Sequence, residues 1–343
     1  MMGEQPGAEP SAPPAMMPEL RFSRWGRVHR QFRSPLMLAV AGAIGVAALL
    51  LAPSILTQYH IHILTLICIY VPLALGQNLI TGNSGQLSMG HAAFYGFGAY
   101  VVGILGGLYD WPTVAILFVA VAGAGLVGLL VGLPTIRISG DYLFIVTIGM
   151  NLVFLDLVTQ WVSLTGGTSG IPGLPTPRFG GLEISSYTDF YYLALIVSAL
   201  CVAIVLAVVH SRFGRTIEAV RDDPIAAAAC GVGVTSVRVS VFVIGASLAG
   251  LSGAVLAYFL GFVGPTDFNI LQSLLIFEMA ILGGLGSVAG SVLGAALMIG
   301  VPEMLRFIQP YRLGLIGTLM ILLMVYRPQG LLGKINVINL IRK

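Results

Sequence analysis

Long, uninterrupted runs of apolar residues dominate this sequence and restrict what it can fold into. Of its 343 residues 57% are hydrophobic and only 9% are charged, and the mean hydropathy is +0.94. Soluble domains usually carry about 25% charged residues. The runs are continuous, as in membrane-spanning helices, and do not alternate as in the strands of a transmembrane barrel. The sequence therefore predicts an all-α, polytopic membrane protein.

About ten runs, with eight as the lower bound, are long enough to be considered as transmembrane helices. They cover residues 36–53, 60–80, 91–109, 113–133, 142–162, 190–210, 239–260, 270–286, 288–308 and 313–326. Together they define a transmembrane domain over residues 35–333. Residues 334–343 form a C-terminal tail.

The first 34 residues form a polar N-terminal tail. Residues 1–20 are rich in Pro, Gly and Ala, which is typical of disorder. Residues 21–34 place three arginines on one side of a predicted helix and aromatic residues on the other, which favours a helix lying in the membrane interface. The alternative is a plain positive-inside topology signal.

Arginines recur on one side of the predicted membrane topology. The N-terminal tail, Arg137, the segment 211–238 and the C-terminal tail all fall on that side, whereas the loop 163–189 falls on the other. Because cytoplasmic loops carry an excess of basic residues, both termini are predicted to be cytoplasmic. We expect a multi-pass protein of a prokaryotic inner membrane.

Two glycine-rich stretches interrupt the apolar pattern. Residues 81–91 and 282–290 each join apolar helices through glycines and a serine. Helix breaks in corresponding positions of two halves often mark a transporter's binding site, because freed backbone groups can hold a polar solute. The alternative is a pair of ordinary tight turns. Close helix contacts are expected at Gly128/Gly132, Ala246/Gly250 and Gly290/Gly294.

Four ionisable residues lie within predicted spans. Glu303 and Arg306 are three residues apart and are expected to pair with each other. Asp156 and Glu278 have no such neighbour, so each either lines a cavity or is hydrogen-bonded between helices.

A polar segment, residues 211–236, separates two apolar runs and carries six charged residues. Because buried charges are costly in hydrocarbon, it must face water. Asp223 followed by Pro224 predicts the start of a short helix, and Gly231 its end. A turn or two is expected over 214–221. The segment is either a docking surface or an ordinary connecting loop.

Motifs for enzymatic chemistry are few. The only lysines, Lys334 and Lys343, lie at the far C-terminus, and no phosphate-binding loop is present. The residues show no metal-ligand spacing, and the three cysteines form no pair motif. Residues 82–85 match the G-x-S-G of intramembrane proteases, but His91 would lie about 10 Å along a helix from Ser84, too far to activate it. We expect neither an enzyme nor a cofactor in this chain.

Six motifs in order carry a resemblance to a known family. They are residues 85–100 (GQLSMGHAAFYGFGAY), 137–142 (RISGDY) with Thr147, 165–171 (TGGTSGI), 211–215 (SRFGR) with 219–223 (AVRDD), 282–287 (LGGLGS) and 327–331 (RPQGL). From about residue 60 to 333 the chain resembles the M-type membrane-spanning subunit of branched-chain amino acid ABC importers, whose fold is similar to that of ribose-type permeases.

The resemblance implies that the polar segment docks on an ATP-hydrolysing subunit. The coupling residues would be Arg215, Glu218, Arg221, Asp222, Asp223, Pro224, Ala226, Ala227 and Gly231. The family's EAA-x-x-x-G motif is altered here, because Ile225 replaces the usual glutamate and Pro224 precedes it.

The resemblance also implies a solute path and an outer docking loop. The path would use Gly82, Asn83, Ser84, Gly85, Gln86, Ser88, His91, Thr147 and Glu278. The outer loop, with Thr165, Gly166, Gly167, Thr168 and Gly170, would face an extracytoplasmic solute-binding protein. A second, related permease and two ATPases holding ATP and Mg²⁺ would complete an alternating-access importer. A urea or short-amide importer and an ATP-independent carrier or channel are the alternatives.

Overall fold

The computed structural model describes residues 49–54, 56–133, 141–304 and a few positions beyond them, namely 314, 317–318, 321, 325 and 330–332. The chain divides into two compact units, Met1–Ala52 and Pro53–Lys343, and the second holds the helical bundle. Several predictions fall outside the described residues: both tails, Arg137, Arg306 and most of the span 36–53. Of the predicted span 313–326 only isolated positions are described.

The bundle contains six helices that are long and apolar enough to cross a membrane within the described residues. They are Gln58–Asn83, His91–Leu108, Thr113–Gly132, Tyr142–Gln160, Tyr187–His210 and Val234–Leu260, and two shorter apolar helices follow at Ile270–Gly283 and Val288–Glu303. The predicted spans between residues 60 and 304 are therefore helical over most of their length. Their limits were less accurate: the span predicted at 239–260 begins at Val234, and the one predicted at 270–286 ends at Gly283.

Two of the long helices are compound. α3 (Gln58–Asn78) continues into the π-helix η1 (Leu79–Asn83), and α4 (His91–Val101) continues into the π-helix η2 (Val102–Leu108). Such π-turns are uncommon and often accompany functional sites. The remaining long helices are α5 (Thr113–Gly132), α6 (Asp141–Gln160), α8 (Tyr187–His210) and α11 (Val234–Leu260).

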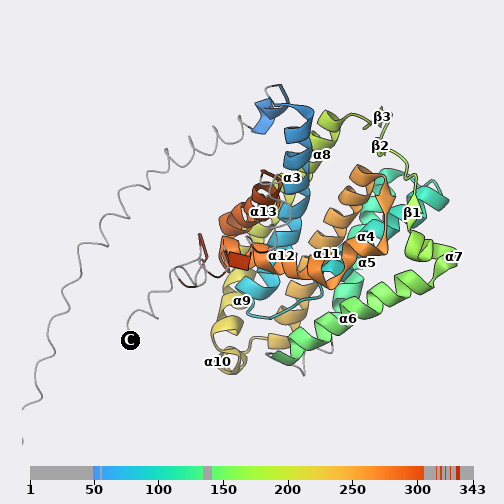
Figure 1. Ribbon diagram of the computed structural model, residues 1–343. Helices are drawn as coiled ribbons and strands as arrows, with labels where there is room; N and C mark the ends of the chain where they lie inside the picture. The colour runs from blue at the N-terminus through green and yellow to red at the C-terminus, as the bar shows by residue number, and fades with distance from the viewer. Residues whose placement is uncertain are drawn as a thin grey trace, which may run out of the picture. The chain divides into compact units, whose positions relative to one another are not determined.

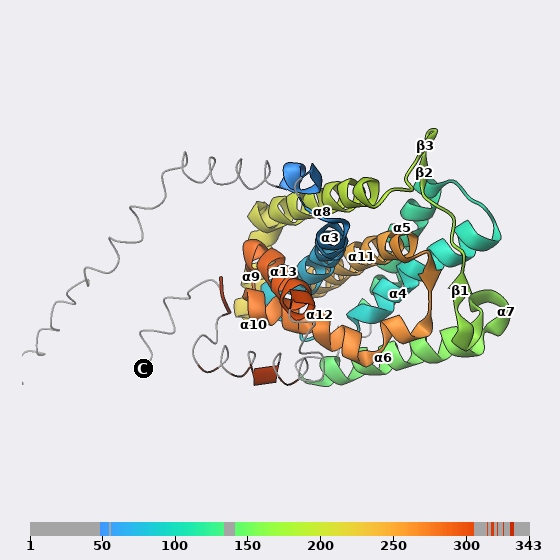
Figure 2. The same cartoon turned by 45° about the horizontal axis from the view of Figure 1, so that its top comes forward.

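α3 lies in the middle of the bundle. It packs against α8, α11, α12 (Ile270–Gly283) and α13 (Val288–Met304), as Figures 1 and 2 show. α4 and α5 pack on the other side of α11, and α6 lies along α4 and α12. The most buried helices are α3, α4 and α11, and the bundle core is built from their Ala, Val, Leu and aromatic side chains.

Short elements connect the spans at the two ends of the bundle. At one end lie α9 (Arg212–Asp222) and α10 (Pro224–Ala229). At the other lie α7 (Val162–Thr165), the 3₁₀-helices η4 (Gly167–Ser169) and η5 (Pro265–Phe268), and the strands β1 (Ile171–Pro172), β2 (Arg178–Phe179), β3 (Leu182–Glu183) and β4 (Phe262–Val263). β1 pairs antiparallel with β4, with Ile171 opposite Val263, and β2 pairs with β3. These small ladders were not predicted.

Glycines bring the helices of the core close together. A methyl group on Gly128 of α5 would lie 2.5 Å from the Ala246 Cβ of α11, and one on Gly290 would lie 2.5 Å from the Gly283 carbonyl oxygen. The close contacts predicted at Gly128, Ala246 and Gly290 are confirmed. In a bilayer, small residues of this kind allow helices to associate by backbone packing.

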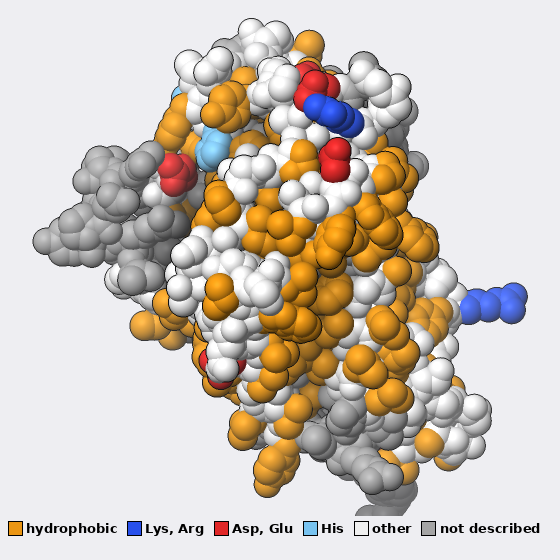
Figure 3. All heavy atoms as spheres, turned by 90° about the vertical axis from the view of Figure 1, so that its right-hand side faces the viewer, with side chains coloured by type: hydrophobic (Ala, Val, Ile, Leu, Met, Phe, Trp, Pro, Cys, Tyr) orange, Lys and Arg blue, Asp and Glu red, His pale blue; other side chains and the backbone are white. Residues whose placement is uncertain are grey.

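Apolar side chains cover the lipid-facing helices. On α5 the exposed positions include Val114, Phe118, Leu126 and Leu130, which recur at helical spacing. Figure 3 shows hydrophobic side chains spread across the middle of one face of the molecule. Such a belt suits the hydrocarbon core of a membrane.

Candidate functional site: two joined helix breaks

The first helix break lies between α3 and α4. After the π-turn of η1 the chain runs without regular structure from Gly85 to Gly90, so the predicted interruption is confirmed. Side chains hold this segment in place: Gln86 donates from Nε2 to the Ser84 hydroxyl oxygen at 2.7 Å, and the Met89 N–H donates to the Thr147 hydroxyl oxygen at 2.9 Å. The break is therefore an ordered part of the core.

The second break separates α12 from α13, and Asn78 of α3 ties it to the first. The side-chain Oδ1 of Asn78 accepts from the Gly286 N–H at 2.8 Å. Its Nδ2 donates to the Ser287 carbonyl oxygen at 3.0 Å and to the Ser291 hydroxyl oxygen at 2.6 Å. Only 2% of Asn78 is exposed. One buried amide thus joins two breaks that lie about 200 residues apart in the chain.

Several polar atoms beside the first break have no hydrogen-bond partner within the described residues. They are the Gln77 Oε1, the Ser88 hydroxyl and both ring nitrogens of His91. All three side chains are fully buried, although Gln77 also donates from Nε2 to the Ser88 carbonyl oxygen at 2.7 Å and to the Thr81 hydroxyl at 2.9 Å. Leaving a buried polar group unpaired costs about 1–3 kcal/mol. This cost would be offset if water or a polar solute bonded these atoms.

The structure brings most of the predicted solute path together. Eight of its nine residues lie in or against the first break: Gly82, Asn83, Ser84, Gly85, Gln86, Ser88, His91 and Thr147. Glu278 is half-buried on α12 and forms no hydrogen bond or ion pair with any described residue. Asp156 is exposed on α6 beside a shallow hollow that Gln160 and Trp161 also line.

The serine of the G-x-S-G motif is engaged elsewhere. The Ser84 hydroxyl donates to the Ile80 carbonyl oxygen at 2.7 Å and accepts from Gln86. Residues 85–90 are not helical, so the helical spacing assumed between Ser84 and His91 was wrong. No hydrogen bond joins these two side chains, both of which are described, and a serine–histidine pair of the protease type is not formed. Among the described residues no cluster of His, Cys, Asp and Glu is arranged to hold a metal ion.

The polar segment 211–236 is built mainly as two helices. α9 is longer than the predicted turn or two, because the Ser211 hydroxyl caps it by accepting from the Gly214 N–H and because Ile217 and Val220 bury its inner face. α10 begins where predicted: the Asp223 carboxylate accepts from the N–H groups of Ile225 and Ala226 at 2.9 and 3.0 Å. Gly231, with φ of 81°, follows its end.

α10 presents an apolar surface to water. Ile225 is 82% exposed, and of the six helix residues only Ala227 is buried. Of the other predicted coupling residues, Arg215, Arg221, Asp222, Asp223, Ala226 and Gly231 are exposed, and Glu218 and Pro224 are partly buried. Ile225 and the exposed alanines beside it therefore form a small apolar patch at this end of the bundle.

The loop 165–170 lies at the opposite end of the bundle. Most of its residues that were predicted to face a solute-binding protein instead anchor the loop. Thr165, Gly167 and Gly170 are buried, Gly166 is partly buried, and only Thr168 is exposed. The Thr165 hydroxyl donates to the Val158 carbonyl oxygen at 2.6 Å, and Gly166, Gly167 and Gly170 all have positive φ. These residues therefore shape the loop and leave Thr168, with Ser169 beside it, exposed.

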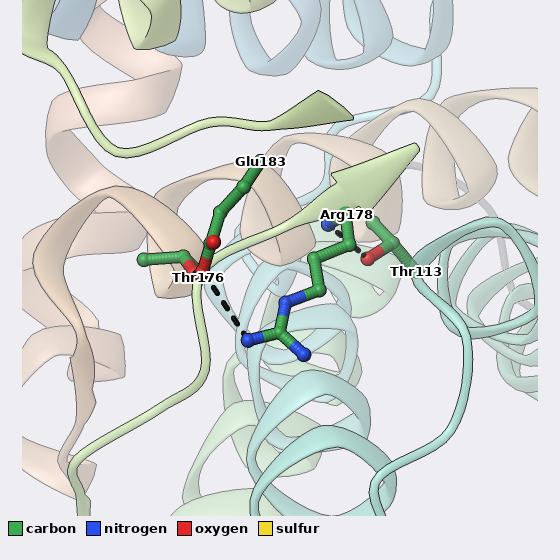
Figure 4. Close-up of polar contacts among 4 residues, drawn as sticks. All are labelled: Thr113, Thr176, Arg178 and Glu183. Carbon is green, nitrogen blue, oxygen red and sulfur yellow. Dashed lines mark hydrogen bonds and ion pairs between the residues drawn. The ribbon is translucent and has the colours of Figure 1, made fainter. Parts of the chain in front are cut away.

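The β2–β3 hairpin is another exposed feature of this end. The Thr176 hydroxyl and the Arg178 guanidinium donate to the Glu183 carboxylate at 2.7 and 3.3 Å, and the Arg178 N–H donates to the Thr113 hydroxyl at 2.8 Å. Figure 4 shows these side chains. The hydrogen bond from Thr176 is the main cause that lowers the pKa of the Glu183 carboxyl group, and the contact with Arg178 is the second. The hairpin is thus a charged, water-facing feature anchored to α5.

Sequence reasoning missed the residues that join the breaks. Gln77, Asn78 and Ser291 lie within apolar runs, and Ser273 of α12 accepts from the Ala92 N–H at 3.0 Å. The available signal was the adjacent pair of amides at the end of an otherwise apolar helix. Without a fold, nothing indicated that Asn78 and Ser291 meet.

Comparison with known proteins gives one consistent result. The family model described as "Branched-chain amino acid transport system / permease component" matches residues 59–324. The chain is 33% identical to the high-affinity branched-chain amino acid transport system permease protein LivM of Escherichia coli over 313 residues, which cover 84% of this chain and 74% of the relative. It is 29% identical to LivH of Salmonella typhimurium over 289 residues, 77% of this chain and 91% of the relative.

A more distant relative is the probable branched-chain amino acid transport permease protein LivM of Methanocaldococcus jannaschii, 25% identical over 245 residues, which cover 66% of this chain and 71% of the relative. No solved structure matches the chain. The family match covers all but the first residue of α3 and every described helix after it, both helix breaks and the α9–α10 segment. The chain therefore belongs to the family of permease components of branched-chain amino acid transport systems.

Proposed function

We propose that this chain is the M-type permease subunit of an ABC importer that moves branched-chain or similarly hydrophobic amino acids across a prokaryotic inner membrane. The observation that carries the proposal is the relationship to LivM, which extends over most of both chains. The similarity to LivH supports a second, related permease as partner. In this proposal the chain forms part of the path that the amino acid takes across the membrane. ATP and Mg²⁺ are bound by separate ATPase subunits.

The solute path in this proposal runs along the two joined breaks. A zwitterionic amino acid needs partners for its carboxylate and ammonium groups, and its aliphatic side chain needs an apolar surface. The unpaired Ser88 hydroxyl, Gln77 Oε1 and His91 ring supply polar partners inside an otherwise apolar bundle. The glycines of the breaks leave backbone groups accessible, as in the broken helices of other transporters.

In this proposal α10 docks on an ATPase and the opposite end receives a solute-binding protein. Exposed Ile225 and the alanines beside it fit an apolar cleft on the ATPase, and Arg215, Glu218, Asp222 and Asp223 form the charged margin. Thr168 and the β2–β3 hairpin face the binding protein. ATP-driven movement at α10 then opens the path alternately to the two sides. The positive-inside rule puts α9, α10 and both termini in the cytoplasm.

Transport in proteoliposomes tests this function. The complex is reconstituted from this chain, the second permease, both ATPases and the binding protein, and uptake of radiolabelled leucine, isoleucine, valine and urea is compared. We expect uptake of the amino acids that depends on ATP and on the binding protein. Selective uptake of urea would instead assign the chain to the short-amide systems, and uptake by this chain alone without nucleotide would identify a carrier or channel.

A substitution in the path tests the residue assignment separately. Ser88 is fully buried beside the first break, so the much larger side chain of Ser88→Trp would crowd the break. We expect uptake to be abolished while assembly with the ATPases is retained. Gly149→Trp is the matched control, because nothing lies within 4 Å of a methyl group placed there. Full uptake by Ser88→Trp would show that the solute takes another route.

A further inference from the structure

Arg221, in the last turn of α9, lies directly against the first helix break. Gly85 has φ of 72°, and a methyl group placed on it would lie 3.2 Å from the Arg221 Cγ, 3.9 Å from its Cβ and 4.0 Å from its Cδ. The three nearest atoms outside the neighbouring residues thus all belong to one side chain. The aliphatic stem of Arg221 therefore runs across the backbone of the break.

The guanidinium of the same side chain reaches the second break. Its Nη1 would lie 3.5 Å from a methyl group on Gly286, the residue whose N–H bonds to Asn78. Gly85 and Gly286 both have positive φ, which favours glycine, so the backbone at both positions is open to a neighbouring side chain. Arg221 thus covers both breaks, and Asn78 joins them from inside the bundle.

The helix that carries Arg221 is packed on the bundle. Ile217 and Val220 are each 1% exposed and fix the inner face of the helix, and α9 contacts η1, α10 and α11. The Arg221 guanidinium forms no hydrogen bond or ion pair with any described residue. The Arg221 side chain therefore lies over the breaks without a hydrogen bond or ion pair to them, so only short-range packing holds it there, and such packing is lost when the groups separate by a few ångströms.

We infer that Arg221 is the positioning residue through which α9 holds both helix breaks closed at the end of the bundle that carries α10. This inference rests on the proposed function for its consequence in transport. When the partner motor displaces α9, the two breaks lose their common cover at the same moment. The side chain thereby links movement at α10 to access from that end to the polar atoms of the first break.

Thiol labelling tests the cover without any partner protein. Ser84→Cys is introduced next to Gly85 in the full-length chain in membranes, with exposed Cys230 replaced by alanine, while Cys68 and Cys201 are buried. We expect Arg221→Ala to raise the rate at which a water-soluble maleimide labels Ser84→Cys by about tenfold. Arg221→Lys keeps the stem and the charge and should preserve most of the protection.

The matched control is Arg212→Ala, which removes another exposed arginine from the same helix. Its labelling rate should equal that of the parent chain. An unchanged rate in Arg221→Ala, or an equal increase in Arg212→Ala, would overturn the inference.

Coupling in the reconstituted importer gives the second measurement. We expect Arg221→Ala to lower the amount of solute moved per ATP hydrolysed by about tenfold. A ratio equal to that of the parent complex would contradict the role of Arg221. If the parent complex moves no solute with ATP, the proposed function fails, whereas the labelling result still decides whether Arg221 covers the breaks.

Discussion

Asn78 shows how much of this bundle depends on one side chain. Its amide bonds to groups from the loop between α12 and α13 and from α13 itself, and all of them are buried or partly buried. In an apolar bundle such an amide specifies one arrangement of helices, because every alternative packing leaves polar groups unpaired. The specificity of the fold near the breaks therefore resides largely in residues that composition alone would not single out.

Replacing Asn78 tests this dependence. Asn78→Leu removes the acceptor of the Gly286 N–H and the donor to Ser287 and Ser291, and we expect a loss of about 3 kcal/mol or more in the free energy of unfolding. Thermal unfolding in detergent measures it. The matched control is Gln160→Leu, an exposed amide on α6 for which little change is expected. Equal stability of both variants would contradict the role assigned to Asn78.

Glu183 gives a pH dependence confined to the β2–β3 hairpin. Its pKa lies below the ordinary value of 4.5, because the Thr176 hydroxyl and the Arg178 guanidinium favour the ionised carboxylate. A carboxyl group whose pKa is lower in the folded state stabilises the fold above the unfolded pKa. We therefore expect the hairpin to be fully protected at neutral pH and to lose protection as the pH falls below 4.5 through the lowered pKa.

Hydrogen exchange of residues 178–183, corrected for intrinsic rates, measures this loss. Glu183→Gln should remove the pH dependence while Thr176 and Arg178 remain in place. A hairpin whose protection stays the same from pH 7 to pH 3 would rule out a stabilising role of the ionised carboxylate.

At the scale of the elements, α4 and α11 approach closely because both carry glycine at their crossing. A methyl group on Gly98 would overlap the carbonyl group of Gly250, and backbone atoms cannot move aside as a flexible side chain would. We expect Gly98→Ala to lower the free energy of unfolding by about 1–3 kcal/mol.

Gly149 on α6 provides the control for this substitution. Nothing lies within 4 Å of an added methyl group there, so Gly149→Ala should not destabilise the protein and gains helix propensity. Thermal unfolding of the two variants in the same detergent gives the comparison. Similar midpoints would show that the α4–α11 crossing tolerates a wider separation.

The elements also show what the sequence could and could not predict. The apolar runs, the glycine breaks and the cap of α10 follow from local patterns, and the structure confirms them. The pairing of β1 with β4 and the bond between Asn78 and Ser291 depend on contacts far apart in the chain. Local periodicity carries no information about such contacts. The sequence therefore predicts the two helix breaks, but not the hydrogen bonds that connect them. The predicted roles of Glu278 and Asp156 in the path stay predictions.

At the scale of the whole molecule, the two candidate docking surfaces should lie on opposite sides of the membrane. Thr168 precedes α8 and Cys230 follows it, and α8 is a single apolar helix of 24 residues. Cys230 should react with an impermeant maleimide from one side only, and Thr168→Cys, placed in a Cys230→Ser background, from the other. Intact cells compared with inverted vesicles make the distinction, and labelling of both from one side would require α8 to be re-entrant.

The β1–β4 ladder has a mechanical consequence for α11. It fixes the C-terminal end of this helix, since Ile171 pairs with Val263 and the Leu174 N–H donates to the Gly261 carbonyl oxygen at 3.1 Å. The other end contacts α9 and accepts a hydrogen bond from Gln86 at the Arg238 carbonyl oxygen. α11 is thus tied down at both ends, and close glycine contacts hold it against α4 and α5, so a displacement that starts at α9 is expected to move the three helices together.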